Sequence, residues 1–243
     1  MRQDLGRFKF GAHQFLCKSD WTDADHGILD AVRRLGCSLF EVSLGDDVQF
    51  DLKRARRHTE ALRIELTVGP GNLWPQVCNI SADEPHHRQL GLAWHKKILE
   101  QAAELGAVTY CAAMYGHPGH VCRRPPPADE LPGTAEDLRT LPNSLIASGF
   151  RWWSMSRFRI HLVNTAAEAV SLVQMADHPN LRVNLDTYHM ITEERDYGAA
   201  IRRVSPLLAT KRMAWMMAFR VLRGRDVPYL GTPLDPQLHK PNR

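Results

Sequence analysis

The sequence lacks any long apolar run, and no stretch approaches the roughly 20 residues that a membrane-spanning helix needs. Its first residues, from Met1 to Leu5, contain no apolar signal-peptide core. Cysteine is also sparse: the five cysteines are odd in number, widely spread and include no Cys-x-x-Cys pair, which argues against a disulfide framework and a zinc knuckle. We therefore expect a cytoplasmic protein with reduced cysteines and no membrane contact.

The chain also lacks a strong excess of charge and a glycine-rich nucleotide motif. Its net charge is +4, and residues 211–243 alone hold seven basic and two acidic residues, so that charge nearly cancels over the rest. No run of five or six like charges occurs, so we do not expect a nucleic-acid partner. No Gly-x-Gly-x-x-Gly turn follows the first predicted strand, which argues against a dinucleotide-binding sheet.

What the sequence does contain is a regular alternation of short β-like runs with amphipathic stretches. The pattern predicts strands at 8–15, 38–42, 64–68, 109–114 and 180–185, with helices at about 24–35, 52–62, 85–105 and 165–176. The last of these helices opens on a capping box at Thr165 and Glu168. Strand and helix repeating every 25–45 residues is typical of parallel βα units. A single (β/α)₈ barrel over residues 1–243 is therefore the preferred architecture.

Two stretches depart from this pattern. Residues 139–156 show little periodicity, and Pro142 interrupts what should be a helix, although residues 150–155 suit a fifth strand. After Leu208 only residues 213–219 suit a seventh strand, and an eighth strand with its helix has no room. We therefore expect a TIM barrel that is incomplete at its C-terminal end. Exposed strand edges would favour association into a homo-oligomer.

Six short motifs occur in order at appropriate spacing. They are Phe10-Gly11-Ala12-His13, Ser19-Asp20-Trp21-Thr22-Asp23, Glu41-Val42-Ser43-Leu44-Gly45-Asp46, Tyr115-Gly116-His117-Pro118-Gly119, Met155-Ser156-Arg157-Phe158-Arg159 and Leu185-Asp186-Thr187-Tyr188-His189-Met190. Together they resemble the sugar phosphate isomerases and epimerases of the xylose-isomerase-like TIM barrel superfamily, with the ketose 3-epimerases as the nearest characterised relatives. The resemblance covers residues 8–138 and 155–208, whereas 139–154 and the tail 209–243 diverge.

The resemblance implies an isomerase with one divalent metal, Mn²⁺, Co²⁺ or Mg²⁺, held by two Glu, one Asp and one His at the carboxyl ends of barrel strands. The two glutamates would remove and return the proton on carbon 3 of a ketose through an enediolate. The chemistry is physically sound, because a proton next to a carbonyl becomes acidic when a Lewis acid neutralises the developing oxyanion. The substrate would be a small sugar or sugar-like molecule. Its identity, its phosphorylation and the choice between epimerisation and aldose–ketose exchange stay open.

Only some of the family's metal-binding and catalytic residues have a counterpart in this chain. Asp186 matches the metal-binding Asp, and His189 matches a histidine that contacts substrate hydroxyls. Trp153 occupies the position of the first catalytic Glu, and an indole neither binds a metal nor takes a proton. Residues 209–225 contain no His to match the metal-binding histidine, and the final Glu has no counterpart. The catalytic residue is therefore unknown, and the chain is expected to be a poor epimerase or an inactive one.

Further candidates for substrate binding lie at or after the predicted strands, where the active sites of barrels gather. They are Glu41, His13, Tyr115, His117 and Trp21. Three of them have a structural alternative: Glu41 as a buried carboxylate paired with an arginine, His117 in a solvated turn, and Trp21 as a cover on the rim of the barrel.

Two other functions compete with the isomerase. An apurinic-site endonuclease would keep the barrel and use three zinc ions, but few of the twelve histidines follow strands in company with Glu. A catalytically inactive pseudoenzyme or a damaged gene product would bind no metal. Metal analysis distinguishes the three, since they predict near-stoichiometric Mn²⁺ or Co²⁺, two or three zinc ions, and none.

Overall fold

The computed structural model describes residues 9–46, 48–70, 74–117, 124–142, 148–150, 162–185, 190 and 193–208. Six parallel strands form one sheet in the order β1-β2-β3-β4-β5-β6, so each strand pairs with its neighbour along the chain. Their bounds are β1 Gly11–His13, β2 Leu39–Leu44, β3 Glu65–Pro70, β4 Thr109–Ala112, β5 Ser148–Phe150 and β6 Leu181–Val183. This is the topology of the first six units of a (β/α)₈ barrel.

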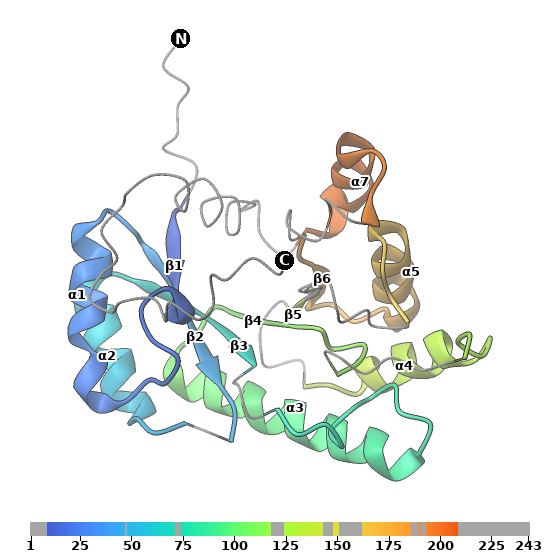
Figure 1. Cartoon of the computed structure of the whole chain (residues 1–243), viewed down its shortest axis with the longest axis horizontal. Helices are drawn as coiled ribbons and strands as arrows, with labels where there is room; N and C mark the ends of the chain where they lie inside the picture. Colours follow the sequence, from blue (N-terminus) through green and yellow to red (C-terminus); the bar gives the residue numbers. More distant parts are fainter. Residues whose placement is uncertain are drawn as a thin grey trace, which may run out of the picture.

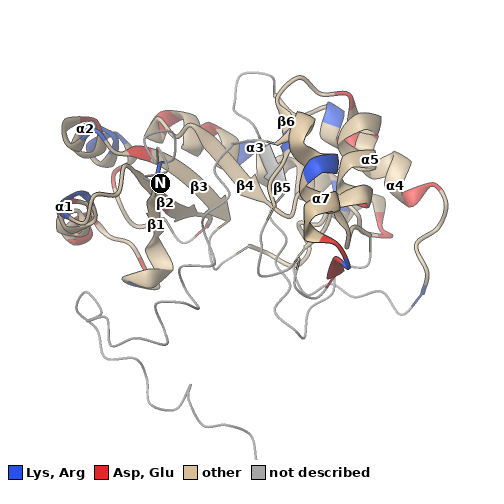
Figure 2. Cartoon of the chain, turned by 90° about the horizontal axis from the view of Figure 1, so that it is seen from above, with Lys and Arg blue, Asp and Glu red and all other residues tan. Residues whose placement is uncertain are grey.

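Helices connect the strands and lie around the outside of the sheet in chain order (Figures 1 and 2). The α-helices are α1 Gly27–Arg34, α2 Leu52–Leu62, α3 Pro85–Leu105, α4 Glu130–Arg139, α5 Ala166–Ala176 and α7 Tyr197–Val204, and the 3₁₀ helices are η2 Gln14–Leu16, η3 Asp23–Asp25 and η4 Ser205–Leu207. Neighbouring helices pack in the pairs α1–α2, α2–α3, α4–α5 and α5–α7. None of the described helices is both long enough and apolar enough to cross a membrane.

The helix ends follow from local sequence. The Asp51 side chain accepts a hydrogen bond from the Arg54 amide at the start of α2, and Arg63 ends that helix in the left-handed conformation with φ of 54°. The predicted capping box of α5 is confirmed, because Thr165 accepts from the Glu168 amide while the Glu168 carboxylate accepts from the Thr165 amide. These caps fix where the helices begin and end against the sheet.

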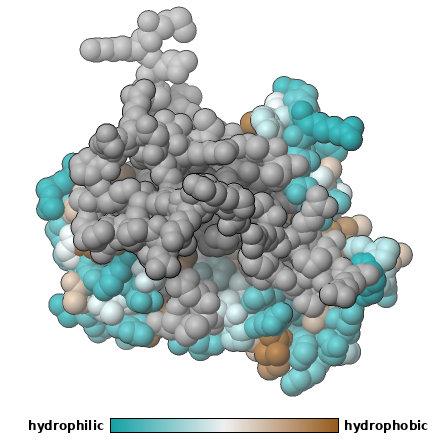
Figure 3. Space-filling view, viewed as in Figure 1, coloured by the Kyte–Doolittle hydropathy of each residue, from teal (hydrophilic) through white to brown (hydrophobic). Residues whose placement is uncertain are grey.

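The hydrophobic core lies between the outer face of the sheet and the helices. Alternate residues of β2 and β3, such as Phe40, Val42 and Val68, are buried there against Ile98 and Ala102 of α3 and other helical residues. Hydrophilic residues cover much of the coloured surface in Figure 3. Burial of one face of each strand leaves the other face, which includes Glu41, for the interior of the barrel.

The structure corrects three sequence predictions. The first strand is only Gly11–His13, because the chain turns into η2 at Gln14. The fifth strand begins at Ser148, before the predicted start at Phe150, and the predicted continuation over 151–155 lies outside the described residues. Helices α4 and α7 were not predicted, and each contains a glycine that weakens the helical signal.

Beyond the six strands, Leu208 forms an isolated parallel bridge with Val183 of β6. This contact marks the place of a next strand beside β6. The strand predicted at 213–219 and the expected gap at the C-terminal end of the barrel lie outside the described residues. The described cysteines, Cys17, Cys37, Cys78 and Cys111, are free thiols, as the sequence predicts.

Candidate active site at the carboxyl end of the barrel

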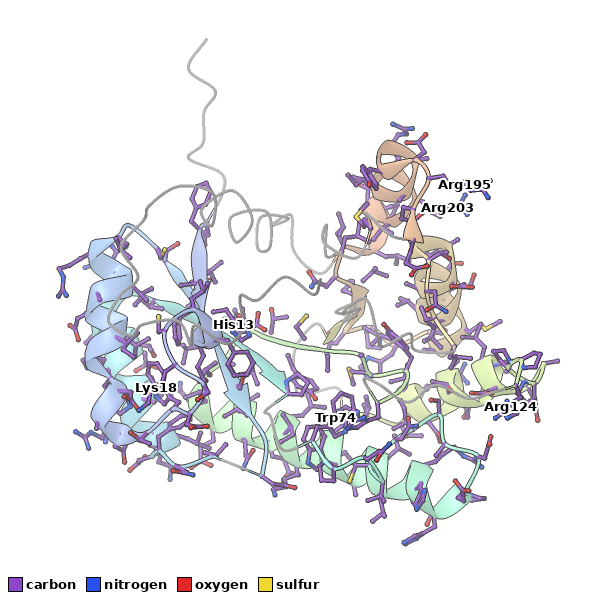
Figure 4. The ribbon with its side chains drawn as sticks, in the orientation of Figure 1. His13, Lys18, Trp74, Arg124, Arg195 and Arg203 are labelled. Carbon is purple, nitrogen blue, oxygen red and sulfur yellow. The ribbon has the colours of Figure 1, made fainter. Side chains whose placement is uncertain are left out.

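His13 and Glu41 form a buried pair at the inner face of the first two strands (Figure 4 labels His13). They are direct partners in the β1–β2 register, and Nε2 of His13 lies 3.3 Å from Oε1 of Glu41, with side chains only 10% and 6% exposed. Nδ1 of His13 accepts a hydrogen bond from the Phe15 amide at 3.0 Å. Because Nδ1 accepts, the ring proton is on Nε2 and points at the carboxylate. Among the described residues, the glutamate therefore has a histidine as its partner.

Gln14 joins the loop after β1 to the end of β2. Its Oε1 accepts from the Ser43 amide and its Nε2 donates to the Ser19 carbonyl, both at 2.9 Å. The side chain is 2% exposed. Gln14 was not predicted as a site residue, because a single amide at a strand end has no distinctive sequence pattern. The only signal is that a polar residue continues an otherwise β-like run. Gln14 therefore links the carboxyl ends of β1 and β2, next to the His13–Glu41 pair.

The same inner face carries further polar groups. Glu41 pairs in register with Thr67, and Thr67 pairs with Thr109 on β4. The hydroxyls of Ser43 and Thr67 are buried and have no hydrogen-bond partner among the described residues. Buried polar atoms without partners are unfavourable and are expected to bind water or a ligand. The interior therefore offers hydroxyl groups beside the carboxylate.

Two residues extend the inner face to β4 and β6. Cys111 of β4 accepts a hydrogen bond from Nδ2 of Asn184, which follows β6, at 3.2 Å. Tyr115 follows β4 and is fully buried, and burial raises the pKa of its phenol, with the nearby Cys111 and Glu168 adding to the shift. The Tyr115 hydroxyl therefore stays protonated and able to donate.

His117 is half-buried and is held by contacts with the loop after β3. Its Nε2 lies 2.9 Å from the Trp74 carbonyl oxygen, and its backbone amide donates to Oδ1 of Asn79 at 3.1 Å. The Trp74 ring packs on the His117 ring with centroids 4.8 Å apart. Figure 4 shows Trp74 close to α3. The loops after β3 and β4 are thereby joined.

The structure does not group Trp21 with the His13–Glu41 pair. Trp21 is 5% exposed and packs against Phe40, with ring centroids 5.3 Å apart, and against Phe50. Phe40 is adjacent to Glu41 on β2 and faces the opposite side of the sheet, toward the helices. The sugar contact predicted for Trp21 therefore stays a prediction.

A comparison with protein families identifies the barrel. The family model described as xylose isomerase-like TIM barrel matches residues 29–218. The chain belongs to this family. Its predicted TIM-barrel fold is thereby confirmed, and the six parallel strands with outer helices are those of the xylose isomerase-like barrel.

Individual relatives of this xylose isomerase-like chain are ketose epimerases. The D-psicose 3-epimerase of Ruminiclostridium cellulolyticum is 29% identical over 82% of this chain and 70% of its own length. The D-psicose 3-epimerase of Agrobacterium fabrum is 27% identical over 82% of this chain and 71% of its own length. The structure of an L-ribulose 3-epimerase superposes with a TM-score of 0.73 at 22% identity over 83% of this chain and 68% of its own. The crystal structure of a D-psicose 3-epimerase in the presence of D-fructose superposes with a TM-score of 0.71 at 26% identity, over 83% of this chain and 71% of its own.

The remaining site predictions lie outside the described residues: Asp186, His189 and Trp153. Strand β6 ends at Val183, three residues before Asp186. Within the described ranges no group of three His, Cys, Asp or Glu side chains is placed to hold a metal ion. The described residues therefore do not form a metal site by themselves.

Proposed function

We propose that this chain is a sugar isomerase or epimerase that binds a small ketose at the carboxyl end of its barrel and moves the proton on the carbon next to the carbonyl. The buried His13–Glu41 pair on the inner face of β1 and β2 carries the proposal. Ketose epimerases as relatives over 82% of the chain support the same reaction class.

The inner face is suited to a polyhydroxylated ligand. The Glu41 carboxylate accepts hydrogen bonds from sugar hydroxyls, and its fixed partner His13 keeps it in place. The hydroxyls of Ser43 and Thr67, which have no partner among the described residues, exchange hydrogen bonds with the ligand. Because these groups are buried, each hydrogen bond is stronger than it would be in water. We propose the same substrate-binding role for Tyr115, His117, Trp21 and His189.

Asp186 remains the proposed ligand of a divalent metal, Mn²⁺, Co²⁺ or Mg²⁺, by resemblance. Such an ion supplies Lewis-acid stabilisation of the oxyanion that forms when the proton leaves. Trp153, at the position of the first glutamate, removes one proton-transfer group, so slow turnover is expected. A pseudoenzyme, a damaged gene product and an apurinic-site endonuclease remain the alternatives, and the metal content of the purified chain distinguishes them.

Glu41→Gln is expected to weaken binding of D-fructose at least about tenfold, since it removes the charge from a buried hydrogen-bond acceptor. Isothermal titration of the full chain with D-fructose measures the dissociation constant. Glu65→Gln is the matched control, because Glu65 lies at the amino end of β3, where it pairs with Lys9. The control should bind as the wild type does. Equal binding by Glu41→Gln, or no binding by the wild type, would count against the proposal.

A further inference from the structure

The loop between β3 and α3 lies unusually close to its own helix. A Cβ atom on Gly91 of α3 would lie 2.8 Å from the Ile80 nitrogen and 2.9 Å from the nitrogen and carbonyl carbon of Asn79. Only glycine permits this approach without a shift. The contact buries Asn79, whose exposed fraction is 1%.

The Asn79 side chain connects two loops at the carboxyl end of the sheet. Its Oδ1 accepts from the Ser81 amide at 3.2 Å and the Ser81 hydroxyl at 3.1 Å, which closes its own loop. The same oxygen accepts from the His117 amide at 3.1 Å, in the loop after β4. One buried oxygen therefore sets the position of the His117 backbone relative to the loop after β3.

The His117 ring is oriented by the same loop. Nε2 faces the Trp74 carbonyl oxygen at 2.9 Å, and since a carbonyl only accepts, Nε2 carries the proton. Trp74 is itself held by a hydrogen bond from its Nε1 to the Cys78 carbonyl at 2.9 Å. Nδ1 of His117 is buried and has no partner among the described residues. In the neutral ring this atom is a hydrogen-bond acceptor that can bind a donor from a ligand.

We propose that Asn79 is a positioning residue of the sugar site, which fixes His117 so that its Nδ1 accepts a hydrogen bond from a ketose hydroxyl. The identity of the ligand rests on the proposed function. The placement of His117 by Asn79 rests on the geometry of the two loops alone. A hydroxyl fits the site because it donates one hydrogen bond and needs no charge at the acceptor.

The test measures the ring tautomer of His117 by ¹⁵N NMR and the dissociation constant for D-fructose in the full chain. Wild type should show the Nε2–H tautomer. Asn79→Ala removes the acceptor and should give mixed tautomers and about tenfold weaker binding. Asn79→Asp keeps an oxygen for the same three hydrogen bonds and should retain the tautomer and bind within about threefold of wild type.

Ser81→Ala is the matched control, since it removes a hydrogen bond to Asn79 and leaves that of His117. Ser81→Ala should keep both the Nε2–H tautomer of His117 and the wild-type dissociation constant for D-fructose. Unchanged His117 signals and binding in Asn79→Ala, loss of the tautomer in Asn79→Asp, or an equal loss in Ser81→Ala would overturn the positioning role. Should the wild type fail to bind D-fructose, the proposed function fails, and the tautomer measurements still decide the role of Asn79.

Discussion

The wild-type protein is expected to lose free energy of unfolding between pH 7 and pH 5, and replacing His95 with glutamine should make that loss about 2 kcal/mol smaller. His95 lies on α3, is 1% exposed, and its Nδ1 is 2.9 Å from the hydroxyl of Tyr110. The rings of Trp74 and Trp94 pack against it, with centroids 5.1 and 5.2 Å from its own. Burial, with a smaller contribution from the charge of His117, lowers the pKa of His95 from 6.5 to about 3.

The sign follows from proton linkage. The unfolded chain binds a proton at His95 near pH 6.5, whereas the folded protein resists protonation until about pH 3. The contribution of neutral His95 to folding is therefore complete above pH 6.5 and is lost as the pH falls toward 3. Glutamine does not titrate, and it offers Tyr110 a hydrogen-bond partner.

Urea unfolding of the full chain at pH 7 and pH 5 measures the difference. His86→Gln is the control, because His86 is exposed near the start of the same helix. The control should lose as much stability as the wild type on acidification, and His95→Gln about 2 kcal/mol less. An identical loss in all three proteins would show that His95 is protonated at the same pH in the folded and unfolded chains.

Two glycine-to-alanine changes in helices are expected to have opposite effects. At Gly91 the added Cβ would meet backbone atoms at 2.8 to 2.9 Å, so the loop must shift, and the free energy of unfolding should fall by about 1–3 kcal/mol. At Gly133 of α4 the added Cβ meets nothing within 4 Å. There alanine should raise the free energy of unfolding by about 0.5–1 kcal/mol, because it reduces the freedom of the unfolded chain.

Thermal and urea unfolding of both variants provide the measurement, and each variant serves as the control for the other. A gain in stability at Gly91 would mean that the loop carrying Asn79 moves freely away from α3. Since that loop also holds His117, Gly91→Ala should disturb the His117 ring signals, whereas Gly133→Ala should leave them unchanged.

Much of the fold could be predicted where local signals agree. The bounds of α2 and α3 match the prediction, because Asp51 caps the first and Pro85 and Gly106 bracket the second. The prediction was wrong where local signals conflict. α4 contains Pro132 and Gly133 near its start, and β5 lies in a segment without alternating polarity.

The sequence predicted which residues belong to the candidate site, but only partly which of them contact one another. Glu41 and His13 were both expected near the mouth, but their pairing depends on the β1–β2 register, which the sequence does not encode locally. Gln14 and Asn79 were missed, since a buried amide that bridges loops has no characteristic spacing. Trp21 looks the same in sequence whether it faces a sugar or, as the structure has it, packs against Phe40.

Proton removal from the carbon next to a ketose carbonyl is the reaction proposed for this barrel. The direct measurement is incubation of the full chain with D-fructose and Mn²⁺ in D₂O, followed by mass spectrometric detection of deuterium at carbon 3. We expect slow, protein-dependent incorporation that Asp186→Asn reduces at least about tenfold. Incorporation no faster than with Mn²⁺ alone would contradict it and would favour an inactive member of the family.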